Sequence, residues 1–219
     1  MYHVTDGIVL NRRTINEADR QICVWTRDIG KVRPVATGSC RVSARMLSLT
    51  EPISRCEFML YVNHGNSGRV RVVGGELKNM FPDVKKDVLR YTFACKVAEA
   101  ADLLTAELDK NEKKYFLLLR TYELLSHAKN PEKIYLAFLL RFLRLCGYGI
   151  EYNKALNLGK KTILAFHNIG RLSGEDVDSL PIQEQELVGI VENYLMEYVG
   201  FPMKTKLFAE KIEKFDILS

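Results

Sequence analysis

The sequence lacks the short motifs that mark the common phosphate-binding, metal-dependent and nucleophile-dependent enzymes. It contains no GxxxxGKS/T or GxGxxG loop, no HExxH helix and no GxSxG turn. Its four histidines are scattered at positions 3, 64, 127 and 167. Its carboxylates fall mainly at helical positions, where pairing with Lys or Arg is the usual role. We therefore expect a protein that is not an enzyme.

Cysteines are few and lack the spacings that build sites. The five cysteines, at positions 23, 40, 56, 95 and 146, include no CxxC pair. An odd number without close pairs supports neither a disulfide framework nor a four-thiolate zinc site. We expect small buried side chains with free thiols, in a reducing cytoplasm.

Long uninterrupted apolar runs are also missing. The early run at 8–10 is followed at once by Arg12 and Arg13, so it does not resemble a signal peptide. The most hydrophobic stretch, residues 135–150, contains Arg141 and Arg144 and is too short to span a bilayer. We expect a buried helix there.

Carboxylates are absent between Asp28 and Glu51, inside the part of the chain that holds the whole charge excess. Residues 1–80 contain 12 Lys and Arg against 7 Asp and Glu, whereas residues 81–219 contain 20 of each sign. Such a local excess is typical of a surface that meets a polyanion. A solvated surface without that role is the alternative.

The spacing of apolar residues changes near Phe81 and divides the chain into two regions. Before it, segments rich in β-branched and aromatic residues alternate with turn signals. After it, apolar residues recur every three or four positions, and Asn130-Pro131 is a helix start. Pro34 indicates an edge or a bulge in the third strand. The predicted strands are 4–12, 20–27, 32–37, 53–62 and 69–77. We expect an α+β chain with a five-stranded barrel at 1–80 and a helical domain at 81–219.

A small barrel joined to a basic segment suits single-stranded nucleic acid. Barrels of the oligonucleotide/oligosaccharide-binding (OB) type lay phosphates against Lys and Arg, and bases against aromatic rings. Trp25 shares one side of its strand with Arg27 and is either a core residue or a stacking ring; Phe58 and Tyr61 are further candidate rings. The predicted DNA contacts are Arg20, Arg27, Lys31, Arg33, Arg41, Arg45, Arg69, Arg71 and Trp25.

Several short segments, taken in their order along the chain, resemble the RecO family of recombination mediators. They are GIVL at 7–10, EADR at 17–20, TRDIGK at 26–31, VATG at 35–38, EL at 76–77 with Phe81, FLLRFLRL at 138–145 with GYG at 147–149, and YLMEYVGF at 194–201. The resemblance implies an N-terminal OB-fold domain and a helical body. It also implies binding to single- and double-stranded DNA, strand annealing, and work with RecR and single-strand-binding protein to seat RecA, in the bacterial cytoplasm at the nucleoid.

Two departures from the family pattern affect the expected chemistry. Many members carry a four-cysteine zinc module that starts as CxxCG, and here residues 155–159 read ALNLG. We therefore expect neither zinc nor any other cofactor, and a metal-free loop or short hairpin over 151–174. The family's basic stretch is also thinned at Thr37, Cys40 and Ser43, which lowers the expected number of phosphate contacts.

The resemblance also implies a partner site in the helical domain, for the acidic C-terminal tail of single-strand-binding protein. Such a tail needs an apolar pocket with a rim of cations. Arg141 and Arg144 share a helix face, with Phe138 close by. The predicted partner residues are Arg90, Lys96, Phe138, Arg141 and Arg144. Simple pairing with nearby carboxylates is the alternative for each arginine.

Two other functions compete with a DNA-binding mediator. The first is a protein-interaction adaptor whose helical domain recruits partners while the barrel binds little DNA. The second is a metal-dependent nuclease on an OB scaffold, which would require clustered carboxylates that the sequence does not display.

Overall fold

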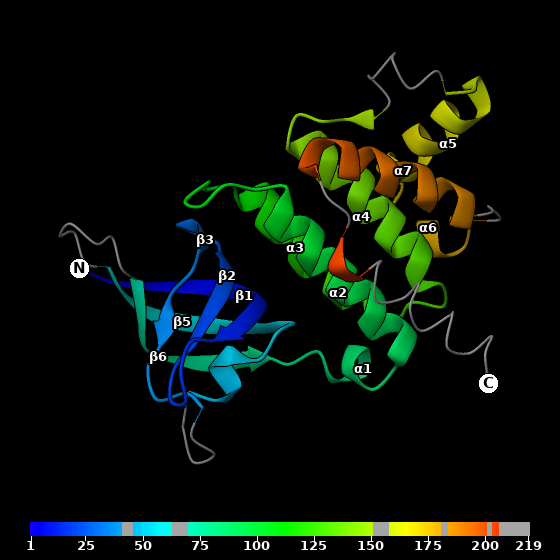
Figure 1. Ribbon diagram of the computed structural model, residues 1–219. Coiled ribbons are helices and arrows are strands. Elements are labelled where there is room, and N and C mark those ends of the chain that lie inside the picture. Colours follow the sequence, from blue (N-terminus) through cyan, green and yellow to red (C-terminus); the bar gives the residue numbers. More distant parts are fainter. Residues whose placement is uncertain (41–45, 63–69, 151–157, 181–183, 201–202, 206–219) are drawn as a thin grey trace, which may run out of the picture. The chain divides into compact units, whose positions relative to one another are not determined.

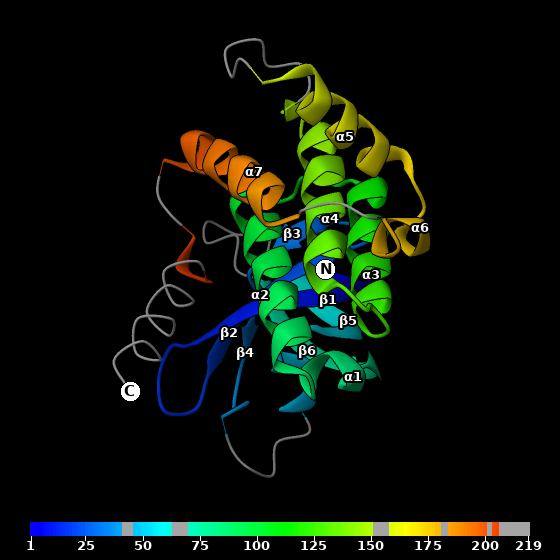
Figure 2. The same cartoon turned by 90° about the vertical axis from the view of Figure 1, so that its right-hand side faces the viewer.

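The computed structural model describes residues 1–40, 46–62, 70–150, 158–180, 184–200 and 203–205. The chain divides into two compact units. The first unit consists of residues 1–81 and 105–119, and the second consists of residues 82–104 and the chain from Arg120 onward. Figure 1 labels the α-helices of both units and all strands except β4, which is labelled in Figure 2.

The strands of the first unit form a closed barrel. They are β1 (Tyr2–Thr14), β2 (Arg20–Thr26), β3 (Gly30–Val32), β4 (Val35–Ala36), β5 (Ser54–Val62) and β6 (Val70–Asn79). Their order is β1-β5-β6-β4-β2, and pairing of β1 with β2 closes the ring. β4 and β6 are parallel, whereas the other pairs are antiparallel. The predicted five-stranded barrel is confirmed.

Pro34 breaks the third predicted strand into two short ones. β3 ends at Val32 and β4 begins at Val35, and both pair with β2. Proline has no amide hydrogen to give to a ladder, so it interrupts the strand. Its carbonyl still accepts a hydrogen bond from the Ile22 amide at 3.1 Å, which holds the connection against β2.

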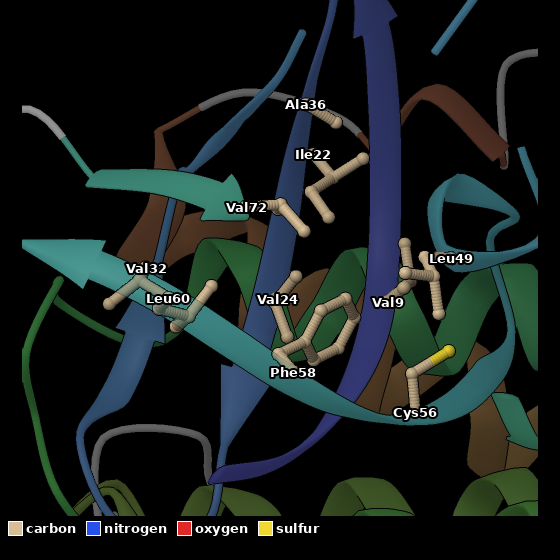
Figure 3. Packing of buried hydrophobic residues seen from close by; sticks show 10 residues of the cluster. All are labelled: Val9, Ile22, Val24, Val32, Ala36, Leu49, Cys56, Phe58, Leu60 and Val72. Carbon is tan, nitrogen blue, oxygen red and sulfur yellow. The ribbon is translucent and has the colours of Figure 1, made fainter. Parts of the chain in front are cut away.

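The barrel interior follows from alternation along the strands, which is interrupted by irregularities in the β1–β2 and β5–β6 pairs. Figure 3 shows the buried cluster: Val9, Ile22, Val24, Val32, Ala36, Leu49, Cys56, Phe58, Leu60 and Val72. Leu49 comes from the short helix η1 (Ser48–Thr50) between β4 and β5. The packing is tight at Gly7, where an added Cβ would lie 2.7 Å from a methyl carbon of Val24.

A distant segment completes the first unit. Leu108 donates its amide to the Lys31 carbonyl at 2.9 Å, and Glu107 forms a parallel bridge with Lys31. Gly30 permits this approach because its φ is +87° and an added Cβ would lie 2.5 Å from the Asp109 carbonyl oxygen. β3 therefore has a hydrogen-bonded neighbour on its outer edge.

The second unit is helical, as predicted. Its helices are α1 (Pro82–Lys85), α2 (Val88–Leu103), the end of α3 (Glu112–Leu125), α4 (Pro131–Leu145), α5 (Lys160–Arg171), α6 (Gly174–Asp178) and α7 (Glu184–Val199). α4 packs against α2, α5, α6 and α7 (Figure 2). It begins as predicted, since Asn130 accepts a hydrogen bond from the Lys133 amide and Pro131 occupies the first turn. Among the described residues, no helix is long and apolar enough to cross a bilayer.

Candidate nucleic-acid interface

The predicted basic residues divide into three groups. Arg41, Arg45 and Arg69 lie outside the described residues. Arg27, Lys31 and Arg33 come from β2, β3 and the turns beside them, and Arg20 and Arg71 come from β2 and β6. The structure does not bring the described residues together into one open surface.

The Lys31 side chain is buried in the first unit and is hydrogen-bonded there. Its amine donates a hydrogen bond to the Thr105 carbonyl at 2.5 Å. The expectation that Lys31 contacts DNA is therefore wrong for this conformation, because the amine already serves a backbone carbonyl out of reach of solvent.

Arg27 and Arg33 are held by carboxylates of the same distant segment. Nε of Arg33 lies 2.9 Å from Glu107, and Nε of Arg27 lies 2.9 Å from Glu112. The Arg27 guanidinium also lies over the Phe116 ring, 5.2 Å from its centroid. The hydrogen bond to Glu112 raises the pKa of Arg27 above its usual value. Both ion pairs are partly exposed, so an incoming anion can compete for the cations.

Trp25 is a buried ring and not a stacking platform. It faces outward from the barrel, opposite Ile8 in β1 and Lys31 in β3, yet only 1% of it is exposed. Strand alternation correctly separates it from Ile22 and Val24, which point inward. Of the two interpretations left open by the sequence, a core residue or a stacking ring, the burial of Trp25 favours the core residue. We call this outer surface, with Ile8, Trp25, Arg27, Lys31 and Arg33, the covered face.

Arg20 lies at the end of the barrel. It lies two positions before the buried Ile22, on the same side of β2, and its Nη1 donates to the Thr50 hydroxyl at 3.0 Å. This contact joins the start of β2 to η1, so we interpret Arg20 as a structural residue at the barrel end.

Arg71 is exposed on the outside of β6. It alternates with the buried Val72, as the strand pattern predicts. Its neighbours in register are Tyr61 on β5 and Val35 on β4. Arg71 makes no ion pair within the described residues. It is therefore available to an anionic ligand.

A second outer surface, which we call the tyrosine face, lies on β1, β5 and β6. It consists of Tyr2, Val4, Met59, Tyr61, Arg71 and Val73. Tyr61 is one of the rings proposed from the sequence, whereas Phe58 points into the core. Tyr2 was missed because the first strand was predicted to start at residue 4. Extending the alternation of Val4 back by two positions would have found it.

Charged side chains occupy the other end of these strands. Arg55 donates two hydrogen bonds from Nε and one from Nη2 to the Asp6 carboxylate, which raises the pKa of Arg55. Lys78 lies 2.6 Å from Glu76 and 3.8 Å from Glu57. These acids are therefore paired, and they lie away from Tyr2 and Tyr61.

The predicted partner residues of the helical unit hold that unit together. Arg90 donates to the Ser126 and Ala128 carbonyls at 2.7 and 3.2 Å. Arg141 donates to the carbonyls of Gly170, Ile169 and Leu172 at the end of α5. These carbonyls lack partners within the helix, and the negative end of the helix dipole favours a cation there. Burial, with a smaller effect of Arg144, lowers the pKa of Arg141.

Phe138 is buried, and the Lys96 side chain is only 13% exposed. The Lys96 amine lies 3.0 Å from Glu192, which also accepts a hydrogen bond from the Tyr135 hydroxyl at 3.1 Å. Burial and Glu192 raise the pKa of Tyr135. The Phe138 ring stacks on Phe142 with centroids 5.0 Å apart. Arg90, Lys96 and Arg141 are therefore engaged by groups of the helical unit, and Phe138 lies in its core, so the structure gives these four residues a structural role. The partner site remains a prediction.

The region expected to form a metal-free loop or hairpin is mostly helical where it is described. Residues 151–157 lie outside the described part, and α5 and α6 follow. Phe166 and Ile169 lie three positions apart on one side of α5 and are buried. Within the described ranges, no three His, Cys, Asp or Glu side chains cluster as metal ligands.

The barrel belongs to the OB type of nucleic-acid-binding and sugar-binding folds. Its closed strand order, with one parallel pair between β4 and β6, defines a five-stranded Greek-key barrel. In this chain the OB barrel is combined with a helical unit, so the protein belongs to the OB-fold proteins that carry an additional helical domain.

Comparisons with known proteins give the family. The model "Recombination protein O N terminal" matches residues 1–80, and "Recombination protein O C terminal" matches residues 85–188. The chain therefore belongs to the RecO family of DNA repair proteins. It is 26% identical to the DNA repair protein RecO of Alkaliphilus metalliredigens, over 88% of this chain and 80% of that protein.

Two further relatives carry the same description. The DNA repair protein RecO of Bifidobacterium animalis is 32% identical over 74% of this chain and 67% of its own length. The DNA repair protein RecO of Bacillus cereus is 21% identical over 99% of this chain and the whole of that protein. The similarity therefore extends over both units.

Proposed function

We propose that the protein is a DNA-binding mediator of recombinational repair. It binds single- and double-stranded DNA, anneals complementary strands, and helps RecR and single-strand-binding protein to seat the recombinase RecA. The observation that carries the proposal is RecO membership over both parts of the chain, with the basic excess confined to the barrel.

Annealing by such a protein requires no covalent step. Cations that neutralise phosphates reduce the repulsion between two strands, and the bases remain free to pair when contacts go to the backbone. Arg27 and Arg33 suit this role because phosphate can replace their partly exposed carboxylate partners. Lys31 does not suit it because its amine is buried.

Contacts with RecR and with the acidic tail of single-strand-binding protein belong to the same proposal. The tail needs cations that are free to receive its carboxylates. Arg90, Lys96 and Arg141 already serve groups of the helical unit, so we do not assign the tail to them. The proposal therefore names these partners without naming their contact residues.

A protein-interaction adaptor is the second candidate. The observation that favours it is that Arg27, Lys31 and Arg33 all have partners within the first unit. In this alternative the barrel binds little DNA, and the helical unit recruits partners.

Fluorescence anisotropy with a labelled oligonucleotide distinguishes the two candidates. We expect binding that weakens as salt rises, because released counterions drive the association. Reversal of Arg41 and Arg45 to Glu should weaken binding to all sequences and flatten its salt dependence. Arg120→Glu, an exposed reversal in the helical unit, is the control. No binding at low salt would favour the adaptor, and DNA cleavage with Mg²⁺ would favour a nuclease.

A further inference from the structure

We infer that the tyrosine face is a base-stacking surface for single-stranded nucleic acid, with Tyr2 and Tyr61 as the rings and Arg71 as the phosphate contact. The inference rests on the proposed function and gives it a location. That location differs from the side of OB barrels, around strands two and three, where oligonucleotides are usually held. In this barrel the corresponding side is the covered face.

The strand register places the three side chains in one row. Tyr2 lies directly opposite Tyr61 in the β1–β5 pair, and Tyr61 lies directly opposite Arg71 in the β5–β6 pair. Residues opposite each other in antiparallel strands project from the same face. The two ring centroids are 5.2 Å apart and the planes are inclined by 55°, so the rings do not stack flat on each other. The Tyr2 side chain is exposed and the Tyr61 side chain is partly exposed, so a base approaching this face meets both residues.

The surface around the rings is apolar and open to solvent. The exposed fractions are 67% for Tyr2, 62% for Val4, 44% for Met59 and 46% for Val73. Contiguous exposed apolar side chains mark an interaction surface. Flat aromatic bases suit it, since stacking on a protein ring tolerates any base sequence.

The charge on this surface favours an anionic ligand. Arg71 is exposed and forms no ion pair within the described residues. On the same strands, Asp6 and Glu76 are farther along and pair with Arg55 and Lys78. A ligand lying across Tyr2 and Tyr61 thus meets an available cation, whereas Asp6 at the other end is paired with Arg55, and Glu57 and Glu76 share Lys78.

Other occupants fit the surface less well. Each of β1, β5 and β6 pairs with a strand on both sides, so a peptide strand finds no free edge to extend. A second copy of the chain, joined face to face by a two-fold axis, would place two copies of Arg71 in the same interface. Single-stranded nucleic acid uses both the rings and the cation.

Photocross-linking locates the contact directly. An oligothymidylate containing 5-iododeoxyuridine is bound to the full chain, irradiated and digested, and the modified peptides are identified by mass spectrometry. We expect cross-links at Tyr2 or Tyr61. Cross-links confined to other peptides would overturn the inference.

Affinity measurements separate the rings from the cation. We expect Tyr2→Ala and Tyr61→Ala each to weaken binding by about fivefold or more, with the salt dependence unchanged, because stacking releases few counterions. Tyr61→Phe retains the ring and should bind as the wild type. Arg71→Gln should lower the salt slope by roughly 0.7. Tyr148→Ala, which removes an exposed tyrosine of the helical unit, is the matched control.

The outcomes distinguish this inference from the proposed function. If the wild type binds no oligonucleotide at low salt, the proposed function fails and the inference fails with it. If the wild type binds and both alanine variants bind equally well with folded circular dichroism spectra, only the inference fails. It also fails if sedimentation shows a dimer that Tyr61→Ala dissociates, because the face would then join two copies.

Discussion

The covered face and the tyrosine face lie on the same barrel and differ in what their side chains already contact. The covered face has more cations, but Arg27, Lys31 and Arg33 are bound by residues 105–112. The tyrosine face has Arg71 as its described cation; its Tyr2 ring is exposed and its Tyr61 ring is partly exposed. Availability of the side chain, rather than the number of cations in the sequence, therefore decides which surface can receive a ligand.

The largest expected effect on stability comes from a substitution at Gly30, where residues 105–110 lie against β3 of the covered face. Gly30→Ala adds a Cβ beside the Asp109 backbone at a φ of +87°, so we expect a loss of roughly 2–4 kcal/mol in the free energy of unfolding. Gly38→Ala is the matched control, because its φ is +69° and nothing lies within 4 Å of the added Cβ. Urea denaturation measures both. Equal losses would show that residues 105–110 do not press on β3.

Arg141, which donates hydrogen bonds to backbone carbonyls, should contribute to the free energy of unfolding. Arg141→Ala leaves the carbonyls at the end of α5 without their donor, and we expect a loss of about 1–3 kcal/mol. Thermal and urea denaturation measure the change, with Arg120→Ala as an exposed control. If Arg141→Ala were as stable as the wild type and lost only peptide-tail binding, Arg141 would be a partner residue after all.

A smaller effect is expected when the carboxylates of the covered face are neutralised. The double variant Glu107→Gln, Glu112→Gln releases Arg33 and Arg27, so DNA should bind roughly threefold to tenfold more tightly with a steeper salt dependence. Stability should change by less than about 1 kcal/mol per pair. Anisotropy measures the affinity, and Glu175→Gln makes a matched charge change on the helical unit. Equal affinity in all variants would leave the covered face outside the DNA site.

No effect at all is expected from removing metal. The thiols that would hold zinc are replaced near residue 155, so a chelator should leave the melting temperature unchanged. Elemental analysis of the purified protein should find no stoichiometric zinc. One zinc per chain would contradict this and would require ligands that the motif does not provide.

Local patterns were sufficient for the barrel but not for its outer surface. The alternation around Val24 and Val72 predicts which side chains fill the interior. Pro34 indicates an edge or a bulge in the third strand, and the structure has a break there, between β3 and β4. The fate of Lys31 depends on Thr105, which lies far along the chain and has no signal near β3. The sequence left Trp25 open between a core residue and a stacking ring for a related reason, since alternation distinguishes inside from outside but not exposed from buried.

The same limit applies to the helical unit. The cap at Asn130 is local, and the sequence predicts it correctly. The Arg141 guanidinium donates hydrogen bonds to carbonyls at the end of α5, and the sequence predicted a loop or hairpin where α5 lies. A cation on an apolar helix is compatible with a ligand rim or with an internal cap, and only the fold distinguishes the two.

The bridge between Lys31 and Glu107 has a consequence for dissecting the molecule. The chain passes from the first unit to the second after Phe81, returns at Thr105 and leaves again after Leu119. A fragment cut after Phe81 would lack the strand-like neighbour of β3, and the Lys31 amine would lose its carbonyl acceptor. A faithful excised barrel therefore needs residues 105–119 supplied as a second peptide or joined by a linker in place of α1 and α2.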